Sequence, residues 1–140
     1  MKITSVIGLG FGDEGKGKVV DRLTKSSTSD KVVIVRHSGG AQAAHHVYNS
    51  DHIHGHHRFQ NFGSGCLNRD KQVITYLSQY MMVDPIQIKE EQKRLGFKPT
   101  LYINQNALVT TPFHVTDNQS NRKSQGISCG MGIGSTKEYW

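Results

Sequence analysis

A glycine-rich segment near the N-terminus, residues 8–18 with the sequence GLGFGDEGKGK, most constrains how this chain can fold. It has the spacing of a phosphate-binding P-loop up to Gly15 and Lys16, with Gly17 where a Ser or Thr would normally bind Mg²⁺. Small residues allow successive backbone N–H groups to turn around phosphate oxygens, and a following helix adds the positive end of its dipole. The segment therefore predicts a phosphate site, with Lys16 as a mobile cation and Asp13 as a substitute ligand for Mg²⁺.

The residues around this loop predict an α/β fold. Residues 3–7 are apolar and predict a strand, and apolar residues recur at helical spacing from Lys16 until the polar residues 26–29. The β-branched run 31–36 predicts a buried parallel strand. A right-handed crossover then places the loop and the segment after residue 36 at one edge of a mostly parallel sheet. We expect one domain over 1–140 with a P-loop-like strand-loop-helix unit; a flexible turn that matches the motif by chance is the alternative.

Segment 12–21, GDEGKGKVVD, closely resembles the N-terminal motif of the adenylosuccinate synthetase family. Enzymes of that family join IMP and aspartate at the expense of GTP, through a 6-phosphoryl purine intermediate. The resemblance implies that Asp13 removes the proton from N1 of the purine and also binds Mg²⁺. It further implies that the phosphates of GTP bind the loop residues, which are Gly12, Asp13, Glu14, Gly15, Lys16, Gly17 and Lys18.

A second loop of small residues, 38–47, follows the strand predicted at 31–36. The family has the pattern Gly-Gly-x-Asn-Ala-Gly-His-Thr here, so the resemblance gives His45 the role of the catalytic histidine. A histidine suits the reaction, because breaking the β–γ bond of a nucleotide builds negative charge that an imidazole can meet. The resemblance also places Gln42 where the family has an IMP-contacting Asn, whose side chain is one methylene shorter. It places Ala44 where the family has a Gly whose carbonyl faces Mg²⁺. An incidental polar side chain is the alternative for His45.

A third loop, 126–136, is again rich in glycine. It resembles the family loop Gly-Thr-Thr-Gly-Arg-Gly-Ile-Gly-Pro, in which a Thr holds the 5′-phosphate of IMP. Ser128 and Cys129 stand at the Thr pair and are the predicted substrate-binding residues, whereas Met131 replaces the Arg and removes a cation. A flexible tail is the alternative for this segment.

The composition favours a soluble protein with an anionic ligand. The 140-residue chain has 17 Lys and Arg against 11 Asp and Glu, a net charge of +6. We expect a nucleotide, because no block of five like charges and no interleaved aromatic residues point to nucleic acid. Cys66 and Cys129 form no CxxC pair, and no apolar segment has the length of a signal peptide or a membrane span, so a cytoplasmic location is expected.

The histidine-rich segment 52–57, HIHGHH, admits two interpretations. Dense histidines can bind Zn²⁺ or Ni²⁺, but no further ligands surround this segment except Asp51, so a solvated hairpin is preferred. Residues 59–65 are expected to line the nucleotide cleft, in the place of the family's Pro-Ser-Gly stretch. His114 is expected to be structural.

The rest of the chain predicts ordinary elements. Strands are expected at 73–77, with apolar length to residue 83, and at 100–104, followed by an apolar segment at 107–110. Asp84, Pro85 and Gln87 form a helix start, and Gly96 ends a helix whose charges we expect to face solvent.

The resemblance spans almost all of this chain but only about the N-terminal third of the family's enzymes. Three functions therefore compete: a synthetase that makes adenylosuccinate, a relative acting on another purine nucleotide such as dGMP, and a non-catalytic nucleotide-binding remnant. They are preferred in that order, because the diaminopurine-forming relatives often replace the Asp at position 13. The first implies GTP, IMP and aspartate as ligands, Mg²⁺ as cofactor, and a homodimer for the full-length enzyme.

Overall fold

The computed structural model describes residues 2–48, 55–125 and 129–140, with the backbone alone at 121–125. Its elements follow in the order α1 (Lys16–Lys25), β1 (Lys31–Gly39), β2 (His45–Tyr48), β3 (His56–Phe59), β4 (Gln72–Val83), α2 (Pro85–Leu95), β5 (Thr100–Ile103), β6 (Leu108–Val109), α3 (Pro112–Gln125) and α4 (Ile133–Tyr139). Strands β1, β4, β5 and β6 form one parallel sheet, and β2 pairs with β3 in a separate antiparallel hairpin. The predicted α/β class with a mostly parallel sheet is confirmed.

Strand β4 is the centre of the sheet, because β1, β5 and β6 all pair with it. Its twelve residues join the two apolar segments that the sequence separates at 73–77 and 80–83. The β1–β4 register runs from Lys31 opposite Gln72 to Gly39 opposite Met81, with one shift after Arg36. This long ladder carries the loop after β1 and the start of α2 to the same edge of the sheet.

The ends of α1 and α2 are set by their flanking residues. Gly15 precedes α1 in the left-handed region with φ 70°, where a residue without Cβ is least strained. Asp84 caps α2 by accepting hydrogen bonds from the N–H groups of Ile86 at 2.9 Å and Gln87 at 3.0 Å. Gly96 ends α2 with φ 73°, as the sequence predicts.

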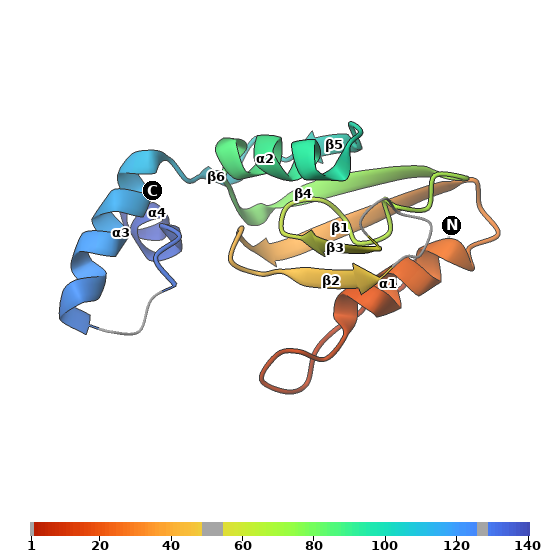
Figure 1. The fold of residues 1–140 in the computed structure, drawn as a ribbon, viewed down its shortest axis with the longest axis horizontal. Coiled ribbons are helices and arrows are strands. Elements are labelled where there is room, and N and C mark those ends of the chain that lie inside the picture. The colour runs from red at the N-terminus through yellow and green to blue at the C-terminus, as the bar shows by residue number, and fades with distance from the viewer. Residues whose placement is uncertain (1, 49–54, 126–128) are drawn as a thin grey trace.

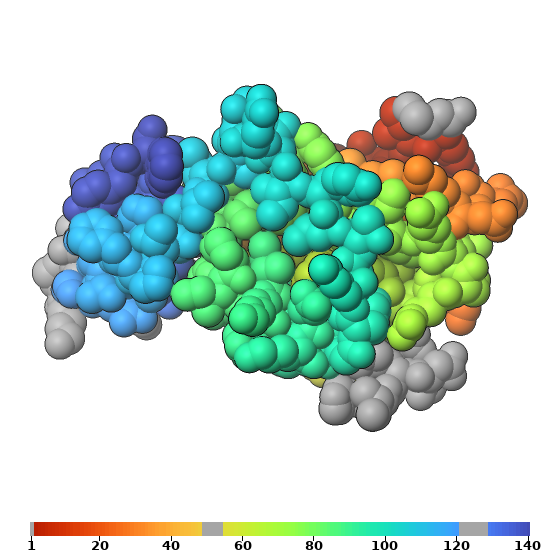
Figure 2. All heavy atoms as spheres, turned by 90° about the horizontal axis from the view of Figure 1, so that it is seen from above, coloured from red at the N-terminus to blue at the C-terminus, as the bar shows by residue number. Residues whose placement is uncertain are grey.

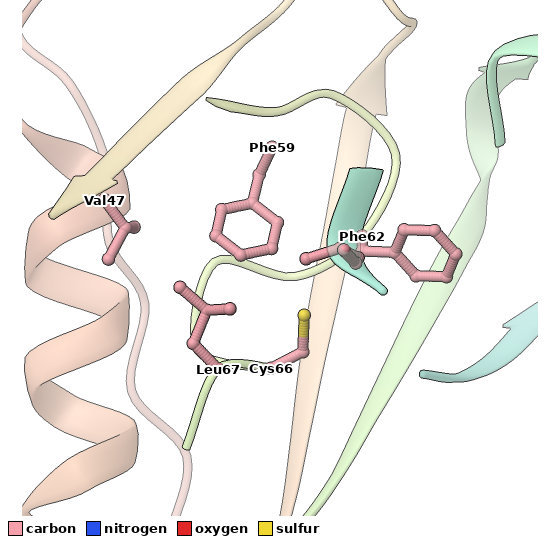
Figure 3. Close-up of a cluster of buried hydrophobic side chains, with 6 residues drawn as sticks. Val47, Phe59, Phe62, Cys66 and Leu67 are labelled. Carbon is pink, nitrogen blue, oxygen red and sulfur yellow. The ribbon is translucent and has the colours of Figure 1, made fainter. Parts of the chain in front are cut away.

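The main hydrophobic core lies between the hairpin, α1 and the segment that follows β3. Figure 3 shows Val47, Phe59 and Leu67 converging beside α1. Residues 59–68 are all buried, and the expectation that 59–65 line a nucleotide cleft stays a prediction. The segment is closely packed: a Cβ on Gly63 would lie 2.8 Å from the Ile34 Cβ, too close for any side chain.

The N-terminal strand predicted at 3–7 is wrong, because residues 2–9 form neither helix nor strand. Ile3 is 78% exposed. A short apolar segment forms a strand when a neighbouring strand pairs with its backbone and a second layer covers its side chains. Within the described chain β1 pairs with β4 alone, and Val33 and Val35 on β1 are more than half exposed, so neither condition is met.

Two helices near the C-terminus escape the sequence analysis. Helices α3 and α4 pack side by side at the end of the molecule away from α1 (Figure 1). A view from above places the red N-terminal residues and the blue C-terminal ones at opposite ends (Figure 2). Helix α3 has Phe113 and Val115 in its first turn but only polar residues from Thr116 to Gln125, so its sequence has no apolar residues at helical spacing that would predict it. His114 in α3 is buried and accepts a hydrogen bond from the Thr111 N–H at 3.0 Å, which supports its predicted structural role.

Candidate functional site

The glycine-rich loop has the backbone geometry that an anion site requires. Gly12 and Gly15 have φ values of 112° and 70°, and Asp13 has φ 51°. A non-glycine residue in the left-handed region is uncommon, although Asp tolerates it better than most, and such strain is concentrated at functional sites. The loop thus presents the Asp13 carboxylate on an exposed turn just before α1.

Three donors of this loop converge on one carboxylate. The backbone N–H groups of Leu9 and Gly10 each donate to Glu14 Oε1 at 2.7 Å, and Lys16 Nζ donates to Glu14 Oε2 at 2.6 Å. The Lys16 hydrogen bond, and after it the one from Gly10, lowers the pKa of Glu14. The carboxylate of Glu14 therefore occupies the position of an anion, as a phosphate oxygen would between two N–H groups and an ammonium.

The glycine-rich loop of residues 8–18 and His45 lie against each other at the first turn of α1. Gly17 is buried there, and a Cβ at this position would lie 2.7 Å from the Cβ of His45. Real Cβ atoms do not approach so closely, so the Ser or Thr of an ordinary P-loop has no room here. The close packing explains why this motif has glycine at that position, and it joins two of the predicted sites.

The imidazole of His45 is neutral in this structure. Burial first, and then the positive charges of Arg36, Lys16 and His46, lower its pKa to about 4. A neutral imidazole can still donate one hydrogen bond to a developing negative charge. At neutral pH His45 is therefore a neutral hydrogen-bond donor.

The loop after β1 brings Gln42 to the start of α4. A Cβ on Gly40 would collide with Ile133 and would lie 2.9 Å from Gln42 Oε1. The Gln42 Oε1 atom is buried and has no hydrogen-bond partner among the described residues. A buried acceptor without a partner is costly, so this oxygen is suited to a donor on a ligand.

The third predicted loop is described only in part. Ser128 lies outside the described residues, whereas Cys129 is exposed and has a free thiol. Gly132 precedes α4 with φ 76°, and its N–H donates to Asn118 Oδ1 at 3.3 Å. Cys66, the other cysteine, is also free, and burial raises its pKa. The structure thus places Cys129 on the surface near α4 and leaves its predicted contact with substrate as a hypothesis.

The donors for a metal ion are few. No group of three or more His, Cys, Asp or Glu side chains that could hold a metal occurs in the described part of the chain. His46 Nδ1 and His56 Nε2 lie 2.7 Å apart on the hairpin, a contact of two histidines alone, while His52 and His54 are outside the described residues. The exposed Asp13 carboxylate fits the usual mode of Mg²⁺, which is bound by one or two carboxylates together with substrate phosphates.

Two residues around the site, Arg36 and Glu91, were not predicted from the sequence, whereas Gln60 lies within the segment 59–65 that the sequence places near the cleft. Arg36 and Gln60 are buried and donate to the carbonyls of Ala43 and Ala41, on either side of Gln42. Glu91 is completely buried on α2, although the sequence predicts that the charges of this helix face solvent. An arginine at the end of an apolar strand was the one available signal, because burial of a guanidinium requires nearby acceptors.

Comparison with known proteins identifies the family. Residues 5–139 match the family model of adenylosuccinate synthetase. The chain belongs to this family. The synthetase of Synechocystis sp. is 34% identical over 139 residues, which cover 94% of this chain and 29% of the relative. That of Thermus thermophilus is 30% identical, with coverage of 93% and 30%.

Solved structures agree on the fold. A fully ligated adenylosuccinate synthetase from Plasmodium falciparum aligns with a TM-score of 0.71 at 25% identity, over 91% of this chain and 31% of that chain. A cyanophage S-2L succinoaminodeoxyadenylate synthetase, bound to dGMP and dATP, aligns with a TM-score of 0.68 at 20% identity, and this shows the fold alone. The chain thus spans about three tenths of the length of its relatives. Within the described residues, no helix is long and apolar enough to span a membrane.

Replacing Gly17 by Ala should displace His45 from the phosphate loop. We expect a loss of about 1–3 kcal/mol of stability from overpacking, partly offset by the better helix propensity of Ala. Thermal unfolding and the NMR signals of His45 measure both effects. Gly134→Ala in α4 is the matched control, because its Cβ would meet only an ordinary contact at 3.7 Å and should be neutral or stabilising. Equal melting temperatures for the two variants would contradict the packing argument.

His45 should titrate near pH 4 in the folded chain. Its folded pKa lies below the ordinary 6.5, so the unfolded chain binds the proton first as the pH falls. The contribution of His45 to stability is therefore constant above about pH 6.5 and is lost between pH 6.5 and 4. NMR titration of the imidazole measures the pKa, and a His45→Gln variant should lose less stability than the wild type over that range. An imidazole that titrates near the ordinary value would show that burial does not act on it.

Proposed function

We propose that this chain carries the phosphoryl-transfer loops of an adenylosuccinate synthetase-type ligase, which joins IMP and aspartate with GTP in purine nucleotide biosynthesis. One observation carries the proposal: a loop with three donors on a single carboxylate packs, through Gly17, against His45. A triphosphate that displaces the Glu14 carboxylate would meet the same N–H groups and the same ammonium. Its terminal phosphate would then lie beside a histidine able to donate a hydrogen bond.

The residues of the chain divide the chemistry between them. Asp13 takes the proton from N1 of the purine, which leaves O6 as the nucleophile that attacks the γ-phosphorus of GTP. The bond from this phosphorus to the β–γ bridging oxygen breaks, and the electron pair leaves with GDP, where His45 and Lys16 meet the charge. The amine of aspartate then displaces phosphate from C6 and gives adenylosuccinate.

Mg²⁺ fits this proposal as a partner of phosphate oxygens. When bound, it would neutralise the charge of the phosphates that the reaction transfers. Asp13 would hold it through a carboxylate oxygen, with the carbonyl of Ala44 as the second protein ligand. Both ligands come from loops that the Gly17–His45 packing brings together.

Gln42 and Cys129 are proposed to contact the purine nucleotide, with Ser128 beside them. The buried Oε1 of Gln42 supports this role, because it needs a donor. Asp13 favours IMP over dGMP, since it supplies the base that the IMP reaction requires. The chain spans about three tenths of its relatives, and we expect it to bind nucleotides mainly through charge, with weak selection of the base and weak turnover.

Lys16→Ala should weaken the binding of GTP by tenfold or more. A lost charge-assisted hydrogen bond to phosphate costs about 1.5–3 kcal/mol. Calorimetry with GTP and with ATP measures the loss and the choice of base. Lys25→Ala, at the far end of the same helix, removes an equal charge and should bind as the wild type does. If both variants lose GTP affinity equally, GTP is attracted by the overall positive charge and not by a site at Lys16.

Asp13→Asn and His45→Ala should abolish phosphate release and preserve GTP binding. The first variant removes the base and the second removes the donor to the leaving group, whereas neither removes Lys16. The assay contains IMP, GTP, Mg²⁺ and aspartate, each omitted in turn, with dGMP in place of IMP as a separate arm. Release with dGMP but not IMP would favour the second function, and GTP binding with no release in any arm would favour a binding remnant. Near-normal rates in both variants would overturn the assignment.

A further inference from the structure

The carboxylate of Glu91 binds a stretch of backbone far from it in the sequence. From α2 it accepts hydrogen bonds from the N–H groups of Gln60 at 3.1 Å, Asn61 at 2.7 Å and Phe62 at 3.4 Å. The Asn61 side chain adds a further bond at 2.9 Å. The side chain of Glu91 is fully buried, so these donors take the place of water around a charged group.

The same stretch of backbone is linked to the loop on either side of Gln42. Gln60 Nε2 donates to the carbonyl of Ala41 at 2.7 Å. Arg36 donates to the carbonyl of Phe62 at 3.3 Å with one nitrogen and to that of Ala43 at 2.9 Å with the other. Both carbonyls that flank Gln42 therefore accept hydrogen bonds from side chains connected to the backbone at 60–62. Gln60 belongs to this backbone, and Arg36 donates to its Phe62 carbonyl.

The buried side chains of Arg36 and Glu91 also interact through their opposite charges. Burial lowers the pKa of Arg36 to about 10, and the negative charge of Glu91 acts in the opposite direction. Burial alone would raise the pKa of Glu91, but hydrogen bonds from His57, Asn61 and Gln60 outweigh it, so this pKa is lowered. Both groups are thus charged at neutral pH, and each offsets part of the cost of burying the other.

We propose that Glu91 is a positioning residue for the loop that carries Gln42: it fixes the backbone at 60–62, which through Gln60 and Arg36 fixes residues 41–43. This inference rests on the proposed function only for what the loop does, since Gln42 is placed there as a substrate contact. The geometry of the relay is independent of that assignment. A carboxylate suits the role because one side chain can accept from several N–H groups at once, which an apolar side chain cannot do.

The experiment compares Glu91→Gln with Glu90→Gln in the full chain. The control lies one position earlier on α2, is exposed, and pairs only with Lys93 among the contacts recorded for its carboxylate. Glu91→Gln keeps the size of the side chain but replaces one acceptor by a donor that faces N–H groups. Hydrogen exchange, followed by NMR, is measured at the Ala43 amide, which bonds to Gly40, and at Leu77 in the centre of β4.

A positioning role predicts a selective effect. Protection at Ala43 should fall by about tenfold more than at Leu77 in Glu91→Gln, because local opening of the loop becomes easier than opening of the sheet. Glu90→Gln should change neither. Equal losses at both amides, or a lower melting temperature with unchanged protection at Ala43, would show a merely structural role and overturn the inference.

Gln60→Met keeps the result interpretable if Glu91→Gln does not fold. It preserves the volume of the side chain and the backbone bond to Glu91, but removes the side-chain hydrogen bonds to Ala41 and from Arg94. Of these two, only the bond to Ala41 holds the loop, so protection at Ala43 should still fall selectively. Ligand binding provides the second measurement: in either variant IMP affinity should fall by about tenfold, with GTP affinity nearly unchanged because Lys16 is untouched. If the wild type binds neither nucleotide the proposed function fails, whereas the exchange data still decide the role of Glu91.

Discussion

The parallel pairing of β1 with β4 is the constraint on which the site depends. It runs from Lys31 opposite Gln72 to Gly39 opposite Met81, and so delivers the loop after β1 and the start of α2 to one edge of the sheet. Parallel strands end at the same edge, so residues far apart in sequence are brought close together there. The hydrogen bonds of Gln60 with Ala41 and of Glu91 with 60–62 then join these segments.

Close packing and charge then act on different parts of the site. Gly17 allows the first turn of α1 to touch His45, so the distance between phosphate loop and histidine is set by the absence of a side chain. Glu14 satisfies the loop's donors with a carboxylate of its own, and this contact is exposed to solvent. The buried pair of Arg36 and Glu91 supports the loop that carries Gln42, where no exchange with solvent is needed.

The sequence predicts the parts of this structure that depend on local chemistry. Positive φ at Gly15 and Gly96, and the Asp84 cap, follow from the residues themselves, and each is where the sequence places it. Residues 3–7 fail as a strand because strand formation needs a partner and a cover, which no local pattern supplies. Glu91 looks identical in sequence to its exposed neighbour, since its burial arises from contacts about thirty positions away. The positions of the loops were therefore predictable from the sequence, whereas the residues that support these loops were not.

The low pKa of His45 has two kinds of cause, burial and nearby positive charge. Burial comes first among its causes, but Arg36, Lys16 and His46 add positive charge around the imidazole. A bound triphosphate would bring several negative charges to Lys16 and offset this field, which favours the protonated imidazole. The charges that would attract a nucleotide thus add to burial in keeping His45 neutral, and a nucleotide would offset these charges but not the burial.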